Sequence, residues 1–138
     1  MNLLENVKVT LVKAQQTSAG TDVESDSVDM EGFEGVVFLA KIATANAANF
    51  LKAQQSSDDG SSDAFADLEG TKVVPGDDGD QAKLDIYRPR ERYVRAVIDR
   101  GGASTATGDI YAVQYGARKA PIANDDAETH VSPAEGTA

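Results

Sequence analysis

The residues best suited to recognition chemistry are arginines in one short segment. Four arginines stand within eight positions, and two tyrosines accompany them. Guanidinium groups bind carboxylates through paired hydrogen bonds, and arginine and tyrosine are enriched at protein-binding hot spots. The same mixture of side chains also binds nucleic acid through phosphate contacts and base stacking. The candidate partner-binding residues are Arg88, Arg90, Arg92 and Arg95.

The distribution of charge indicates which of these interpretations is favoured. The 138-residue chain has a formal net charge of −10, yet residues 83–119 hold eight basic and four acidic side chains, a net of +4. A basic segment inside an acidic chain favours pairing with carboxylates of the same fold or of a neighbouring subunit. A partner protein is the second interpretation. Nucleic acid is the least favoured partner because it requires a concentrated basic surface.

The chain lacks the residues that most catalytic and metal-binding sites require. There is no cysteine, and the single histidine, His130, stands eight residues before the last residue. Disulfides, cysteine-ligated zinc, a Ser-His-Asp triad and a multi-histidine metal site are therefore excluded within one chain. We predict that the protein is not an enzyme and uses no cofactor.

Two acidic turns, residues 58–63 and 77–80, raise the question of calcium. Calcium takes about six to eight oxygen ligands, and neither turn has the oxygen spacing or the final glutamate of an EF-hand loop. Aspartate and glycine also occur in turns because they tolerate left-handed backbone and form Asx turns. Plain turns are the favoured interpretation and calcium is the alternative, so we assign no metal ligand.

Short apolar runs between turn signals predict strands along most of the chain. The run at residues 36–43 is nearly continuous in apolar residues, which is typical of a strand buried on both faces. Residues 49–54 are another candidate strand, with a helix over residues 45–55 as the alternative because alanine, leucine and glutamine are frequent there. The other predicted strands are residues 7–13, 28–30, 64–69, 71–74, 84–88, 93–98 and 110–115.

These elements indicate an all-β fold. Residues 15–27 are predicted to be a loop and residues 100–104 a turn, because small and polar residues dominate both. About seven to nine short strands separated by turns favour a single-domain antiparallel β-sandwich or a jelly-roll-like barrel. We assign this domain to residues 1–119 and predict that residues 120–138 form a flexible, acidic tail, extended or disordered.

The chain shows no sign of a membrane or secretory segment. No run approaches the roughly 18 consecutive apolar residues that a transmembrane helix requires, so we expect no membrane partner. Residues 1–16 lack a charged segment followed by an apolar one, so they do not resemble a secretory signal.

Three stretches, taken in order, carry a resemblance to a known family. They are residues 28–38, which contain GFEGVVF, residues 54–68 with their Ser-Asp-Asp-Gly turn, and residues 84–97, which contain RYVRAV. This succession resembles small structural proteins of tailed bacteriophages, generally encoded near the major capsid gene. The resemblance extends over about residues 28–115.

The resemblance implies a viral structural protein located in the virion and assembled in the bacterial cytoplasm. The expected role is that of a capsid decoration (cement) protein, which binds the outside of the phage head and stabilises it. Its partners would be the major capsid protein and further copies of itself, with a trimer favoured. The alternatives are a head–tail connector or tail component, or a non-viral β-sandwich that binds carbohydrate or another ligand.

Overall fold

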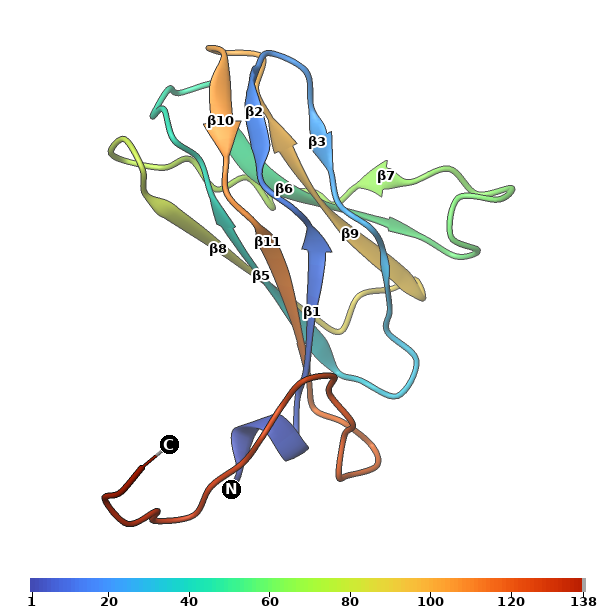
Figure 1. Ribbon diagram of the computed structural model, residues 1–138. Coiled ribbons are helices and arrows are strands. Elements are labelled where there is room, and N and C mark those ends of the chain that lie inside the picture. Colours follow the sequence, from blue (N-terminus) through green and yellow to red (C-terminus); the bar gives the residue numbers. More distant parts are fainter. Residues whose placement is uncertain (138) are drawn as a thin grey trace.

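The computed structural model describes residues 1–137, and its regular elements are strands apart from one short 3-10 helix (Figure 1). In chain order the elements are η1 (Leu3–Glu5), β1 (Lys8–Lys13), β2 (Gln16–Ala19), β3 (Val23–Glu24), β4 (Val28–Asp29), β5 (Gly35–Lys41), β6 (Phe50–Ser56), β7 (Ala66–Asp67), β8 (Gln81–Tyr87), β9 (Tyr93–Asp99), β10 (Thr105–Thr107) and β11 (Ile110–Tyr115).

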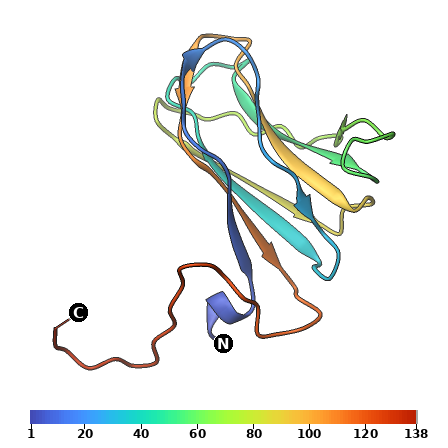
Figure 2. The ribbon, with the colours of Figure 1, turned by 45° about the vertical axis from the view of Figure 1, so that its right-hand side comes forward.

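Two antiparallel sheets form a single-domain sandwich, as Figures 1 and 2 show. The first sheet has the order β1-β11-β5-β8. The second sheet has the order β3-β9-β6-β7, and β4 also pairs with β9. A short ribbon of β2 and β10 extends one end of the sandwich. The predicted all-β class and the antiparallel sandwich are therefore confirmed.

The core lies between the inward faces of the two sheets. On β5 and β8 the buried residues alternate with more exposed ones, as expected for strands with one covered face. Phe38, Ile110, Leu51 and Ile98 are fully buried, two from each sheet. Because apolar side chains of both sheets interdigitate, burial of their surface is the main force that holds the sheets together.

Two predictions about local structure are wrong. Residues 15–27 are not a loop, because they contain β2 and β3. The polar QTSA sequence of β2 pairs only with β10, so it never acquires the apolar alternation that identifies a buried strand. Residues 36–43 are not buried on both faces, since Leu39 on the outward face of β5 is 37% exposed.

The helix alternative for residues 45–55 does not occur. Residues 50–56 form β6, which pairs along its whole length with β9. Helix-favouring alanine and glutamine are overridden there by burial of Leu51 and Ala53 against the first sheet. The strands predicted at residues 64–69 and 71–74 shrink to β7 and an isolated bridge between Val73 and Leu51.

Arg100 is an unexpected buried residue. It follows β9, where the sequence predicts a turn, yet it is only 4% exposed. Its guanidinium donates hydrogen bonds of 2.6–2.9 Å to the backbone carbonyls of Thr21, Thr17 and Thr105. It therefore fastens β10 and the segment from β2 to β3 to the end of the second sheet.

The C-terminal segment first contacts the body and then leaves it. Ile122 donates its backbone N–H to the carbonyl of Glu5 at 2.8 Å. Asn124 bonds to β1 and to the segment before it, and residues 125–137 are exposed and run away from the sandwich (Figures 1 and 2). The boundary at residue 119 and the disorder of the tail stay predictions. Among residues 1–137, no helix is long and apolar enough to cross a membrane.

Candidate functional site: an apolar sheet face and an arginine-lined hollow

Two of the four predicted partner-binding arginines are engaged within the fold. Arg92 donates two hydrogen bonds to the carboxylate of Asp29, at 2.9 and 2.8 Å, and lies 2.7 Å from Glu31. The Arg92 guanidinium lowers the pKa of Asp29 chiefly through these hydrogen bonds. This geometry is the internal charge pairing that the charge distribution favours.

Arg95 lies further along β9 and is similarly engaged. Its guanidinium makes two bonds of 3.0 Å to Glu24 and one of 2.8 Å to the side chain of Gln54. It also stacks over Phe65, 4.4 Å from the ring centroid. These contacts join β3, β9, β6 and the loop before β7, so Arg95 stabilises the outward surface of the second sheet.

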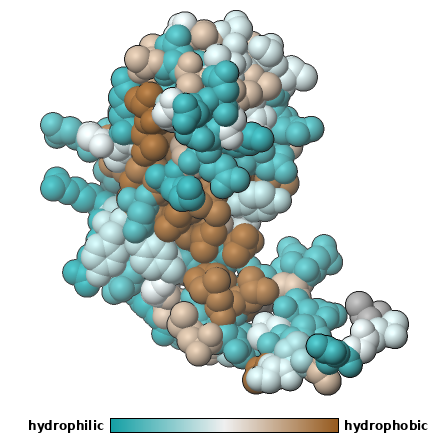
Figure 3. Space-filling view, turned by 90° about the vertical axis from the view of Figure 1, so that its left-hand side faces the viewer, coloured by the Kyte–Doolittle hydropathy of each residue, from teal (hydrophilic) through white to brown (hydrophobic). Residues whose placement is uncertain are grey.

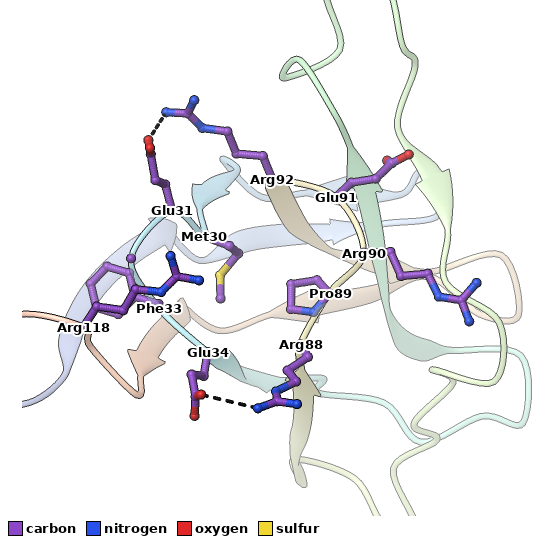
Figure 4. Close-up of a pocket in the computed structure, with 11 residues that line it drawn as sticks. Met30, Glu31, Phe33, Glu34, Arg88, Pro89, Arg90, Glu91, Arg92 and Arg118 are labelled. Atoms are coloured by element: carbon purple, nitrogen blue, oxygen red, sulfur yellow. Dashed lines mark ion pairs between the residues drawn. The ribbon is translucent and has the colours of Figure 1, made fainter.

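Arg88 and Arg90 are held less firmly. Arg88 is exposed, adopts a φ of 52° and lies 3.7 Å from Glu34, which is a long ion pair. For Arg90 no ion pair occurs among the described residues, and Figure 4 shows its side chain on the far side of Pro89, directed away from Arg118. The four arginines thus do not converge on one point.

The β4–β5 turn, the β8–β9 loop and the segment after β11 together enclose an open hollow of about 560 Å³ at one end of the sandwich (Figure 4). We call it the end hollow. Met30, Phe33 and Pro89 supply its apolar surface, and Arg118 extends between them (Figure 4). Sequence reasoning missed Arg118 because it stands 23 positions after Arg95, outside the arginine-rich segment.

The outward face of the first sheet carries a second feature, a continuous apolar surface. Its cross-strand rows are Leu11–Tyr111–Leu39 and Val9–Val113–Val37. Leu11 is 47% exposed, and Val9, Leu39 and Tyr111 are 37–40% exposed. Figure 3 shows the resulting hydrophobic band crossing one side of the molecule, flanked by hydrophilic residues. We call these six residues the sheet face.

One end of this face is stiffened by an aromatic side chain. The ring of Tyr115 on β11 lies against Gly35 on β5, in the space that a Cβ atom at Gly35 would occupy. The Tyr115 hydroxyl donates a 2.7 Å hydrogen bond to Asp85 on β8. Burial and this hydrogen bond raise the pKa of Tyr115 to about 12. Gly35 is therefore required by a close approach between neighbouring strands.

The acidic turns use their carboxylates to hold the backbone. Asp58 accepts hydrogen bonds from the N–H groups of Ser62 and Asp63, and these lower its pKa. Asp80 accepts from the N–H of Asp77, and Asp78 from that of Ala45. Within residues 1–137 no three acidic or histidine side chains lie together as metal ligands would.

Comparison with known proteins identifies the fold. No family model and no curated sequence matches the chain. The crystal structure of PBSX exported protein XepA matches over 98% of this chain at a TM-score of 0.57 and 16% identity. This chain spans 46% of the length of XepA. The sandwich is therefore a fold found in about half of a larger exported protein.

Two further solved structures show weaker likeness. SPBc2 prophage-derived protein YomS matches over 78% of this chain and 93% of its own, at a TM-score of 0.45 and 10% identity. The structure of Bacillus endospore appendages, which form a novel family of disulfide-linked pili, matches over 80% of this chain and 88% of its own, at a TM-score of 0.39 and 13% identity.

Proposed function

We propose that the protein is a structural component of a bacteriophage virion, and specifically a decoration protein that binds the outside of the head and stabilises it. The single observation that carries the proposal is the sheet face. Six apolar or aromatic residues on three adjacent strands form one outward surface, in which Val9, Leu11, Leu39 and Tyr111 are exposed and Val37 and Val113 are half-buried. Contiguous exposed apolar surface of this kind marks protein–protein contact.

The continuity of the apolar run in β5 supports the same proposal. Val37 and Leu39 face outward while Val36 and Phe38 face the core. The strand is therefore apolar on both faces, as strands are that are packed against other protein on both faces. The chain covers one side only. A partner protein would bury the outward face of β5. An apolar face that is left uncovered in the free protein suits adhesion to a preformed shell.

The motif resemblance of residues 28–115 to small phage structural proteins selects the class of partner. The proposed partner is the major capsid protein, and the proposed assembly is a homo-oligomer, most simply a trimer at a local three-fold position. The role needs no reaction and no cofactor. Arg88 and Arg90, in the loop that follows β8 of the first sheet, would add polar contacts at the rim of such an interface, whereas Arg92 and Arg95 are engaged with Asp29 and Glu24 of the second sheet.

Imaging tests this proposal directly. Purified protein is mixed with heads that lack it, and the particles are examined by electron cryomicroscopy. We expect added density at regular positions on the outer surface of the shell. Density confined to the neck or tail, or unchanged heads at micromolar protein, would contradict the decoration role.

A further inference from the structure

The end hollow presents a positive charge that its own fold does not neutralise. The backbone N–H of Arg118 donates a 2.9 Å hydrogen bond to the carbonyl of Gly32, which fixes the start of its side chain beside the β4–β5 turn. Gly116, with a φ of 66°, lets the chain turn closely around Glu34 to reach this position. Among residues 1–137 no carboxylate forms an ion pair with Arg118.

The other charges around the hollow define what would bind there. Arg92 is already saturated by Asp29 and Glu31, whereas Arg88 holds Glu34 only at 3.7 Å. Arg118, which forms no ion pair among the described residues, and Arg88, whose ion pair with Glu34 is long, are thus the arginines able to bind carboxylates on an incoming chain. The apolar surface of Met30, Phe33 and Pro89 between them suits a small aliphatic side chain. The matching ligand is an extended acidic segment with an apolar residue.

The C-terminal tail of this protein has that composition. Residues 125–137 contain four acidic side chains and no basic one, and they include Val131 and Pro133. Val131 is 75% exposed, and every residue from 125 to 137 is exposed. An acidic segment with an uncovered aliphatic residue gains contacts only when it docks on another surface.

The anchoring of the tail directs it away from its own hollow. The side chain of Asn124 donates to the carbonyls of Leu4 and Val7 and accepts from the N–H of Val9. In Figures 1 and 2 the tail leaves this point on the side opposite the β4–β5 turn that borders the hollow. Fully extended, thirteen residues reach at most about 45 Å, far enough to cross onto a neighbouring molecule.

We propose that residues 125–137 of one copy bind the end hollow of a second copy, with Arg118 and Arg88 pairing with the acidic side chains and Val131 lying against the apolar surface. Repetition of this exchange around a symmetry axis closes a homo-oligomer. The proposal concerns association of the free protein, so it is measured without heads and is independent of whether the sheet face binds a shell.

Sedimentation equilibrium of the full chain tests the exchange. We expect wild type to form a species whose mass is at least twice the 14.5 kDa of one chain. The variant Arg118→Glu should weaken self-association roughly ten-fold or more, since it replaces attraction by repulsion. Lys119→Glu, the matched control with the same charge change on the adjacent exposed residue outside the hollow, should associate nearly as wild type does.

A charge swap distinguishes exchange from a general charge effect. A tail variant carrying Asp125→Lys, Asp126→Lys and Glu128→Lys should fail to associate alone yet associate when mixed with Arg118→Glu. A monomeric wild type at all concentrations, undiminished association of Arg118→Glu, or absence of association in the mixture would each overturn the proposal. Docking of the tail on its own hollow would give the first of these results.

Discussion

Buried polar side chains fix the end of the sandwich opposite the hollow. Arg100 donates to three backbone carbonyls there, and fully buried Asn49 donates to the carbonyls of Thr44 and Ala103. Buried polar groups of this kind are stable only when their hydrogen bonds are satisfied. Both residues therefore act as structural links between loops that carry little apolar surface of their own.

Replacement of Arg100 should destabilise the whole domain. In Arg100→Leu the carbonyls of Thr17, Thr21 and Thr105 lose their donor, and the loss is costly above all at Thr105, which is buried away from water. We expect the free energy of unfolding to fall by about 2–4 kcal/mol, measured by chemical denaturation. The exposed Arg90→Leu is the control and should change it by less than about 0.5 kcal/mol. Equal effects of the two variants would contradict the structural role of Arg100.

Tyr115 should make stability sensitive to alkaline pH. Because its pKa is raised from 10.0 to about 12, the folded state holds the phenolic proton where the unfolded state releases it. Its contribution to stability is complete below about pH 10 and is lost as the pH rises through about 12. Tyr115→Phe should remove this dependence. The difference in tyrosinate absorbance between wild type and variant should have its midpoint near pH 12, and a midpoint near 10 would refute the assignment.

At the residue scale the sequence predicts the charge pairing but not its geometry. The arginine-rich segment and its internal pairing are visible in the composition, and Arg92 and Arg95 bind Asp29 and Glu24 as that interpretation expects. The roles of Arg100 and Arg118 depend on chain segments far away in the sequence. Burial of one and exposure of the other follow from tertiary packing, which local composition does not encode.

At the element scale, strands with apolar alternation are predictable and polar edge elements are not. The predicted strand at residues 110–115 coincides with β11, and the predictions for β1 and β9 are within about a residue at each end. β2, β3 and β10 escape prediction because pairing, rather than their own apolar pattern, creates them. The exposure of the outward face of β5 could not be predicted either, because composition shows that the strand is apolar but not which of its faces the rest of the chain covers.

The free edge of β1 offers a prediction at this scale. The side-chain amide of Asn124 imitates a neighbouring strand, because it both donates to Val7 and accepts from Val9. In Asn124→Ala the amide of Val9 loses its acceptor and becomes an open strand edge. Hydrogen exchange at Val9 should then accelerate at least ten-fold, while exchange at core β11 amides stays unchanged. Unaltered exchange at Val9 would show that Asn124 does not protect the edge.

At the scale of the whole molecule, two surfaces have separate proposed roles. The sheet face would contact the shell, and the end hollow would receive the tail of a neighbouring copy. The two surfaces use different physics, since one depends on burial of apolar area and the other on arginine–carboxylate pairing. High salt should therefore weaken self-association much more than binding to heads.

The most direct test of the central claim is the affinity of a sheet-face variant for phage heads. Leu39→Glu places a charge on the β5 side of the face, and Val74→Glu places the same charge at an exposed apolar position beside the second sheet, where Val74 is 42% exposed. Both variants should fold, because neither side chain belongs to the core. In cosedimentation with undecorated heads we predict that Leu39→Glu binds at least ten-fold more weakly than wild type and that Val74→Glu binds equally well. Wild-type binding by Leu39→Glu would contradict the proposed function.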